Sequence, residues 1–324
     1  MTREVPDCIH CGNAGTICQM KVFDPDGIIS KPWSYRKCSN PDCGLVWLDP
    51  APLPTELWKA YTSYHTHTKV LTNKTTKTLL SLCNRLVRGL LLPLWLVNGQ
   101  QREAQQMRLL MLGDHPRGKL LDIGCGGGRY LYRMKRHGWQ VEGIDFDAQA
   151  TRRVSGRYGI KTYTGDILAA NLPEASFDAI TMSHTIEHLV DPAAILRECL
   201  RILKPGGKLI LVTPNIDSNA AALFGAFWRG WEPPRHLYLF SVSTLQLFLL
   251  EAGFAVQEAR TSAVASAIIY RVSRTLQQGS STSLWFQLKL ILWSYLQELR
   301  DFKAQRAGKQ VAQNVLTIAV KPLH

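Results

Sequence analysis

The sequence predicts an α/β fold, a doubly wound and mostly parallel sheet of seven strands. Three observations support this fold class. Strand-like apolar runs alternate with helix-like segments from residue 118 onward. The first run leads directly into a glycine-rich turn, LLDIGCGGGRY, and later runs end in aspartate. Because parallel sheets bind ligands at the carboxyl ends of their strands, we expect a nucleotide-type site at that edge.

The expected elements follow one another in a regular order. Short apolar runs predict strands, whereas longer segments with apolar residues three and four apart predict helices. Strands are expected at 119–124, 140–147, 160–166, 177–183, 208–215, 255–262 and 313–322. Helices are expected at 127–138, 147–159, 192–203 and 243–254. We expect the KPGG sequence at 204–207 to end the third of these helices.

The glycine-rich turn lacks the spacing of a dinucleotide site. In the G-x-G-x-x-G fingerprint, the third glycine lets the helix pack close to the first strand. Counted from Gly124 and Gly126, that third position is Arg129. The turn instead has Asp122 two residues before the first glycine and a further glycine at Gly128. The turn is therefore not expected to bind NAD.

Two cysteine pairs near the start of the chain predict a metal site. Each pair, in CIHCG and CSNPDCG, is followed by a glycine that lets the backbone turn around the sulfur atoms. Four thiolates leave no open coordination position, so we expect a structural zinc ribbon over residues 1–50. The alternatives are unpaired buried thiols, or a contribution from His10 or Cys18. The expected zinc ligands are Cys8, Cys11, Cys38 and Cys43.

The net charge of +13 is concentrated in two segments. Residues 51–118 have a net charge of +6 and residues 264–310 of +5, while residues 1–50 have −1. The excess either serves solubility or indicates an anionic partner such as a phosphorylated acceptor or a membrane surface. With eight cysteines and no apolar run in the first ten residues, we expect a cytoplasmic protein.

Each positive segment contains an apolar helical stretch, at 78–97 and at 283–302. One interpretation is core packing or a lid over the acceptor. The other is an interfacial helix, because aromatic anchors and flanking cations are typical of helices that lie on membranes. That second interpretation would place the protein peripherally at the inner membrane face.

The order of the motifs resembles class I S-adenosylmethionine-dependent methyltransferases. The matching segments are LLDIGCGGGRYL, VEGIDFD, GDI, FDAITMSHTIEHLVDP and ILKPGGKLILVTPN. The ribbon, CGLVWLDPAP and the tyrosine and histidine cluster at 61–67 are similar to methyltransferases in which a zinc ribbon precedes this fold. The resemblance implies a Rossmann-like methyltransferase domain at 118–324, with a helical insert at about 264–310. Residues 51–117 would form a helical connector and lid.

The resemblance also implies which residues bind the donor, S-adenosylmethionine. Asp145 would accept the ribose hydroxyls, and Asp166 with Ile167 would contact the adenine. Ser183 would line the methionine end. The full set of expected donor contacts is Asp122, Gly124, Gly126, Gly128, Asp145, Phe146, Asp166, Ile167 and Ser183.

Methyl transfer needs a general base only where the acceptor must lose a proton. The candidates are His184, His188 and His236; the last lies in WRGWEPPRHLYLFS, where Trp228 and Trp231 could wall an acceptor pocket. The expected acceptor is a small molecule, a sugar or a lipid-linked glycan, methylated on oxygen or carbon. An RNA methyltransferase is an alternative, although the ribbon has no basic excess and nucleic acid is not expected. A donor-binding scaffold without catalysis is the other alternative.

Overall fold

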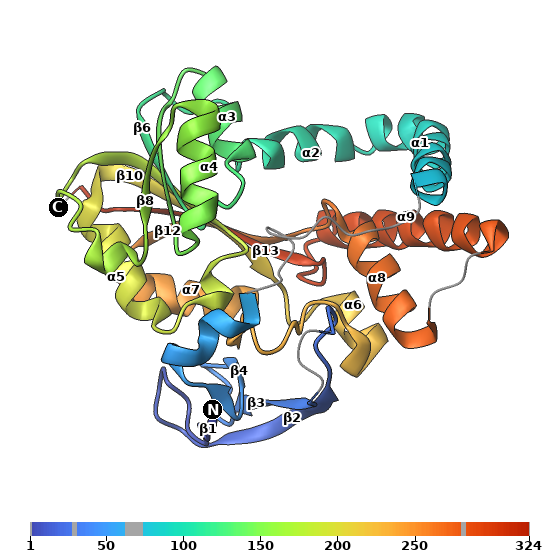
Figure 1. Ribbon diagram of the computed structural model, residues 1–324, viewed down its shortest axis with the longest axis horizontal. Helices are drawn as coiled ribbons and strands as arrows, with labels where there is room; N and C mark the ends of the chain where they lie inside the picture. Colours follow the sequence, from blue (N-terminus) through green and yellow to red (C-terminus); the bar gives the residue numbers. More distant parts are fainter. Residues whose placement is uncertain (1, 28–30, 62–73, 280–282, 324) are drawn as a thin grey trace.

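The computed structural model describes residues 2–27, 31–61, 74–279 and 283–323. Its main layer is a seven-stranded sheet flanked by helices (Figure 1). The strand order is β12-β13-β10-β9-β6-β7-β8. Neighbouring strands are parallel except at β13, which runs antiparallel to both β10 and β12. The expected fold class is confirmed.

The elements of this layer lie close to their expected positions. The strands are β6 (Lys119–Ile123), β7 (Gln140–Asp145), β8 (Lys161–Thr164), β9 (Phe177–Ser183), β10 (Leu203–Pro214), β12 (Ala255–Ser262) and β13 (Asn314–Val320). The flanking helices are α3 (Arg129–Arg136), α4 (Ala148–Tyr158), α5 (Pro192–Ile202) and α7 (Val242–Glu251). Side chains of Asp147, Asp191 and Ser241 accept backbone N–H groups at the start of α4, α5 and α7.

Helix α5 ends at Ile202, one residue before its expected end, but the following strand begins earlier than expected. Strand β10 begins at Leu203, which pairs with Phe177, and the pairing register then shifts before Lys208. The KPGG residues therefore follow the end of the helix and lie within an irregular part of the strand, which was expected to start only at residue 208.

A second, four-stranded sheet contains the cysteine pairs. It consists of β2 (Gly15–Val22), β3 (Trp33–Cys38), β4 (Val46–Leu48) and β11 (Tyr238–Leu239). The short β11 lies between β10 and α7 in the sequence, and it pairs antiparallel with β4. A two-stranded pair, β1 (Thr2–Arg3) and β5 (Ala51–Pro52), lies beside it. Buried side chains of both sheets, among them Tyr35 and Ile180, belong to one continuous core.

The remaining helices are α1 (Lys74–Val97), α2 (Gln100–Arg108), α6 (Asn219–Phe224), α8 (Ser266–Gln278), α9 (Leu284–Arg306) and the 3-10 turns η1 (Pro54–Tyr61), η2 (Ile167–Ala169), η3 (Ile186–His188) and η4 (Gly225–Phe227). Helices α1 and α9 pack together on the right of Figure 1. Cys83, Val87 and Trp95 face α9, whereas Leu86 and Leu90 on α1 are exposed. Within the described ranges, no helix has the length and apolarity to cross a bilayer.

Candidate functional site

Asp145 connects two loops at the carboxyl edge of the main sheet. Its carboxylate accepts the backbone N–H of Gly126 at 2.8 Å and that of Asp147 at 2.9 Å. The glycine-rich turn after β6 and the loop after β7 are therefore held together by one buried side chain. This placement at adjacent strand ends suits a ligand that contacts both loops.

Three of the four glycines of the turn, Gly124, Gly126 and Gly128, have different structural roles. All of them have positive φ, from +47° at Gly126 to +78° at Gly124. A Cβ on Gly124 would lie 2.3 Å from the Thr185 hydroxyl, and one on Gly128 would lie 2.6 Å from Val154. A Cβ on Gly126 would meet no described atom within 4 Å. Gly124 and Gly128 thus permit internal packing, whereas Gly126 leaves open space where a ligand can approach.

Asp122 lies buried beneath the turn. Its Oδ1 accepts the Thr181 hydroxyl at 2.6 Å. Burial raises the pKa of Asp122 to about 7, and the charge of Asp145 adds to this effect. Near neutral pH, a nearby positive group would therefore favour loss of the proton from this carboxyl group.

The other expected donor residues lie after β7, β8 and β9. Phe146 is 58% exposed, and its ring packs against Tyr61 of η1 with centroids 4.7 Å apart. Asp166 is exposed and caps η2, while Ile167 is buried. Ser183 is exposed at the last position of β9. Of the cluster at 61–67, residues 62–67 lie outside the described residues.

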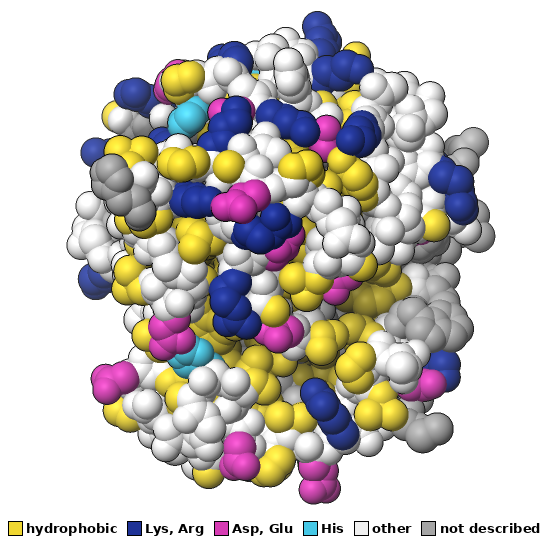
Figure 2. Space-filling view, turned by 90° about the vertical axis from the view of Figure 1, so that its left-hand side faces the viewer, with side chains coloured by type: hydrophobic (Ala, Val, Ile, Leu, Met, Phe, Trp, Pro, Cys, Tyr) yellow, Lys and Arg dark blue, Asp and Glu magenta, His cyan; other side chains and the backbone are white. Residues whose placement is uncertain are grey.

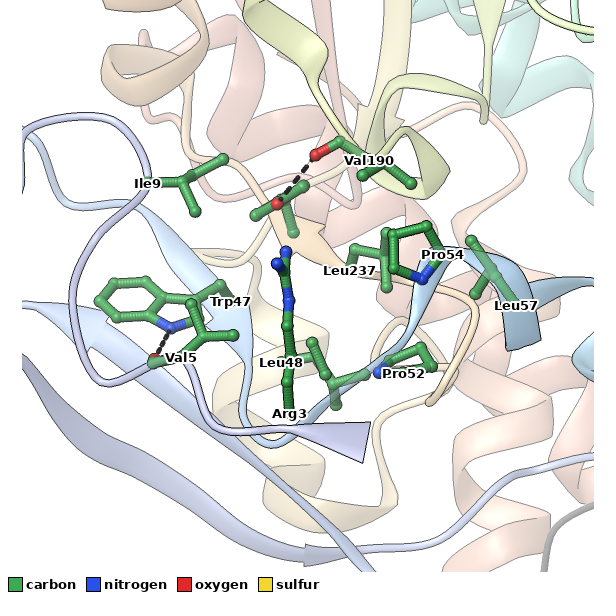
Figure 3. A pocket seen from close by; sticks show the side chains of 12 residues that line it. Arg3, Val5, Ile9, Trp47, Leu48, Pro52, Pro54, Leu57, Val190 and Leu237 are labelled. Carbon is green, nitrogen blue, oxygen red and sulfur yellow. Dashed lines mark hydrogen bonds between the residues drawn. The ribbon is translucent and has the colours of Figure 1, made fainter. Parts of the chain in front are cut away.

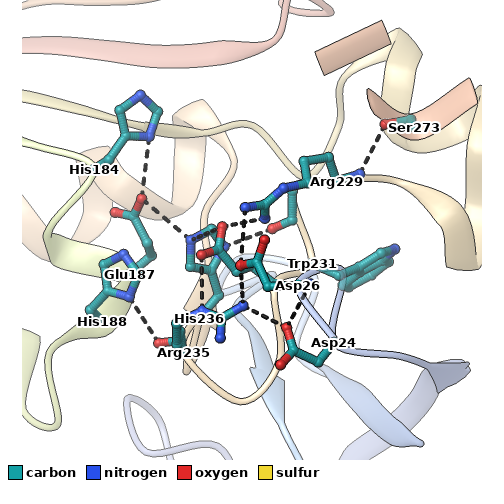
Figure 4. A network of polar contacts seen from close by, with 12 residues as sticks. Asp24, Asp26, His184, Glu187, His188, Arg229, Trp231, Arg235, His236 and Ser273 are labelled. Atoms are coloured by element: carbon teal, nitrogen blue, oxygen red, sulfur yellow. Dashed lines mark hydrogen bonds and ion pairs between the residues drawn. The ribbon is translucent and has the colours of Figure 1, made fainter. Parts of the chain in front are cut away.

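Three histidines and two glutamates gather next to these loops (Figure 4). His184 Nδ1 lies 3.4 Å from Glu187 Oε1, and His236 Nε2 lies 4.0 Å from the same oxygen. Glu232 Oε2 is 3.7 Å from His236 Nε2. The rings of His188 and His236 meet edge to face at 4.7 Å. All three base candidates are therefore brought together.

The hydrogen bonds of two histidines define their tautomers. His236 Nδ1 donates to the carbonyl of Gly230 at 2.7 Å, and His188 Nδ1 donates to that of Arg235 at 3.0 Å. A carbonyl only accepts, so each Nδ1 holds a proton, and the Tyr61 hydroxyl also lies 3.0 Å from Nδ1 of His188. Such imidazoles with a carboxylate are also ligand types for divalent metals, and the ligand atoms of Glu187, His188 and His236 lie within 4.8 Å of one another.

Glu187 is the electrostatic centre of the cluster. It is fully buried; Oε2 accepts the Thr213 hydroxyl at 2.9 Å, and Oε1 has no hydrogen bond among the described residues. Burial alone would raise its pKa, but His184 and the other two histidines lower it to about 2. A buried carboxylate oxygen without a donor favours protonation of a neighbouring imidazole.

The environments of two histidines differ. Burial lowers the pKa of His236 to about 4, so this ring is neutral over the physiological range. The half-exposed His184 also loses solvation, but Glu187 raises its pKa above the ordinary value. The backbone of His184 has φ +54°, which lies in the left-handed region that is uncommon for residues other than glycine. The half-exposed ring is thus the more basic of the two.

Sequence reasoning missed Glu232 and Arg235 as members of the polar cluster. Trp228 and Trp231, expected as possible walls of an acceptor pocket, are buried in the core and pack edge to face at 5.6 Å. The charged EPPRH sequence at 232–236, between the tryptophans and β11, is the feature that could have pointed to this polar cluster. Nothing local in that sequence identifies its distant partners.

The four predicted zinc ligands lie together. Their sulfur atoms are all within 4.8 Å of one another, with Cys8–Cys43 at 3.7 Å and Cys11–Cys38 at 3.4 Å. Tetrahedral coordination with Zn–S bonds of about 2.3 Å requires S–S distances of about 3.8 Å. His10 and Cys18 lie elsewhere: His10 stacks on Phe248, and Cys18 donates to the Tyr35 carbonyl.

A small apolar pocket lies where the ribbon meets the main domain (Figure 3). Val5, Trp47 and Leu57 line it from one side, and Val190 and Leu237 from the other. Figure 2 shows the face of the molecule that lies on the left of Figure 1, with hydrophobic side chains in a hollow between its lower and upper parts. Few polar groups converge there, so the donor loops and the histidine cluster remain the better candidate site.

Comparisons with known proteins agree with this fold. The family model described as a methyltransferase domain matches residues 97–259, half of the chain, and the chain belongs to this family. The predicted resemblance to class I methyltransferases is thereby confirmed.

Similar proteins include ubiquinone biosynthesis O-methyltransferases. That of Xanthomonas oryzae pv. oryzae is 37% identical over 139 residues, covering 40% of this chain and 56% of the relative. That of Stutzerimonas stutzeri is 33% identical over 154 residues, covering 43% and 66%. The chain therefore spans about half to two thirds of the length of the curated relatives it matches.

Among solved structures, the [4+2]-cyclase SpnF has a TM-score of 0.49 at 20% identity, covering 69% of this chain and 83% of that one. Phosphoethanolamine N-methyltransferase 2 of Haemonchus contortus, in complex with S-adenosyl-L-methionine, has a TM-score of 0.47 at 20% identity, covering 67% and 52%.

Proposed function

We propose that this protein transfers a methyl group from S-adenosylmethionine to a hydroxyl oxygen of a small-molecule acceptor. The observation that supports this most directly is the histidine–carboxylate cluster directly beside the donor loops. The family match supports the donor, and the name of the relatives, O-methyltransferase, supports oxygen as the accepting atom. A hydroxyl acceptor must lose its proton, which gives the cluster a chemical task.

His184 is the proposed general base, and Glu187 is its positioning partner. Glu187 Oε1 faces Nδ1 at 3.4 Å, which leaves Nε2 to take the acceptor proton. In the neutral ring the proton is on Nδ1, toward Glu187, and the Glu187 carboxylate would stabilise the positive charge that the ring gains when Nε2 takes the acceptor proton. His236, neutral and buried behind Glu187, limits the number of competing positive charges in the cluster. The sulfonium donor is already activated, so alignment and proton removal are the main contributions of the protein.

The donor site is tested by calorimetric titration with S-adenosylhomocysteine. Wild-type protein should bind it, and Asp145→Ala should weaken binding at least tenfold, because both loops lose their common acceptor. Asp178→Ala is the matched control, since Asp178 accepts the Lys119 N–H at 2.7 Å at the opposite end of β6. Equal loss of affinity in both variants would contradict the assignment of Asp145.

The base is tested by methyl transfer to hydroxylated aromatic acceptors and to sugar and lipid-linked phosphates. His184→Gln should lower kcat by about 10²–10⁴ at unchanged S-adenosylhomocysteine affinity. In wild type the rate should fall as pH drops through the raised pKa of His184, because the protonated ring accepts no proton. A variant that keeps both rate and pH profile would exclude His184 as the base.

We further propose that Cys8, Cys11, Cys38 and Cys43 hold one structural zinc ion. The support is the sulfur geometry together with the burial of three of the four thiols, with Cys11 half-buried beside them. The ion would cross-link the turn before β2 to the turn after β3. Metal analysis of purified protein should give one zinc per chain.

A further inference from the structure

We propose that the ribbon positions the loop at 229–236 and, through this loop, the histidine–carboxylate cluster on the acceptor side of the active site. This inference rests on the proposed function. It assigns the ribbon a role in the reaction, which the cysteine geometry alone does not. Three independent sets of contacts, through a guanidinium, a hydroxyl and a strand, support it.

The first contact is a buried ion network (Figure 4). Arg235, whose side chain is 0% exposed, places Nη2 2.6 Å from Asp24 and 2.8 Å from Asp26, both in the β2–β3 connection of the ribbon. Its Nε lies 3.0 Å from Glu232 in its own loop. Arg229 contacts Asp26 and Glu232 as well. Two ribbon carboxylates thus hold both arginines of the loop.

Such a network is better suited to fixing geometry than to adding stability. Removing five charged groups from water is costly, and their mutual attraction roughly offsets that cost. What the network supplies is a defined orientation, because the guanidinium fork fits carboxylates in only a few arrangements. The Arg235 carbonyl is also the acceptor for His188 Nδ1, so the orientation of the loop reaches a second histidine.

The second contact comes from Tyr35 on β3. Its buried hydroxyl lies 2.6 Å from the carbonyl of Trp231 and 3.1 Å from that of His236. Both ends of the segment that folds around His236 therefore share one ribbon donor. The carbonyl of Gly230, next to Trp231, accepts the hydrogen bond from His236 Nδ1.

The third contact is the strand pairing of β11 with β4. The carbonyl of Leu237 accepts the N–H of Leu48 in the ribbon at 2.9 Å, and the N–H of Leu237 donates to the carbonyl of Glu187 at 2.8 Å. The backbone of Leu237 thus connects the ribbon to the backbone of Glu187, the residue whose carboxylate faces His184. A displaced ribbon would move Glu187 and His236 together and leave Asp145 in place.

The test is Tyr35→Phe, which removes one hydroxyl and keeps the ring. We expect kcat to fall at least tenfold while the affinity for S-adenosylhomocysteine is unchanged. The matched control is Tyr270→Phe, another buried tyrosine, which donates to Asp301 at 3.0 Å between α8 and α9, away from the site. It should retain wild-type kcat. Equal effects of the two substitutions on kcat would overturn the inference.

A second readout needs no acceptor. Nitrogen NMR of the histidine rings should show His236 protonated on Nδ1 in wild type and in Tyr270→Phe, and a mixture of tautomers in Tyr35→Phe. An unchanged His236 signal in Tyr35→Phe would overturn positioning even if kcat fell. Wild type that binds S-adenosylhomocysteine but methylates none of the acceptors would contradict the proposed function, while the NMR result would still decide the positioning.

Discussion

At the scale of single residues, the donor loop offers a matched pair of substitutions. Gly126→Ala adds a methyl group in open space, so it should cost only about 1 kcal/mol for the positive φ, yet weaken donor binding at least tenfold. Gly128→Ala drives the same methyl group into Val154 and should cost about 2–3 kcal/mol more. Urea unfolding and calorimetry measure the two effects. Equal stability losses would contradict the distinction between a packing and a binding glycine.

Residues in local motifs could be predicted, whereas those in long-range contacts could not. Asp122, Gly126 and Asp145 stand at strand ends, and the apolar alternation places those ends at one edge of the sheet. The ribbon partners of Arg235, Asp24 and Asp26, are more than 200 residues away in sequence, and no period or spacing indicates them. The preference for His184 over His236 depends on burial, which only the fold reveals.

At the scale of elements, helix α9 contains a buried acid that should make stability depend on pH. Glu298 accepts the Ala267 N–H at 2.9 Å and the Gln100 amide at 2.8 Å. Burial raises its pKa to about 7. The folded protein therefore binds a proton that the unfolded chain has already released above pH 4.5, so stability falls as pH rises from about 4.5 to 7.

Glu298→Gln should remove the contribution of Glu298 to this slope, a difference of about 3 kcal/mol across that range, while the buried Asp122 keeps its own contribution. The new amide can donate to the buried Gln100 Oε1, which has no hydrogen bond among the described residues, once the Gln100 amide turns over. Urea midpoints between pH 5 and 8 measure the effect. The exposed Glu251→Gln is the control, and a slope identical in wild type and Glu298→Gln would show that another group causes it.

Element boundaries show the limit of pattern reading. The alternation predicted all seven strands of the main sheet, because buried parallel strands are short apolar runs. It missed β11, since two residues, Tyr238 and Leu239, have no period to detect. It also started the fifth strand at Lys208, whereas pairing of Leu203 with Phe177 begins that strand at Leu203. Tertiary pairing decides in both places.

At the scale of the whole molecule, the shared core predicts cooperative unfolding. Tyr35 of the ribbon and Ile180 of the main sheet belong to one continuous cluster, so loss of the proposed zinc ion should destabilise the entire protein. Calorimetry should show one transition in zinc-loaded protein, and chelation should lower its Tm by several degrees. A separate low-temperature transition after chelation would indicate that the ribbon unfolds alone.

The position of β13 has a consequence for biosynthesis. Residues 314–320 lie between β10 and β12, although the latter is made about 50 residues earlier. Until β13 emerges from the ribosome, each neighbour presents an unpaired edge of seven or more residues. Ribosomes that stall before residue 314 would release chains prone to pair with one another, so this protein is exposed to aggregation during translation in proportion to the time spent on that last stretch.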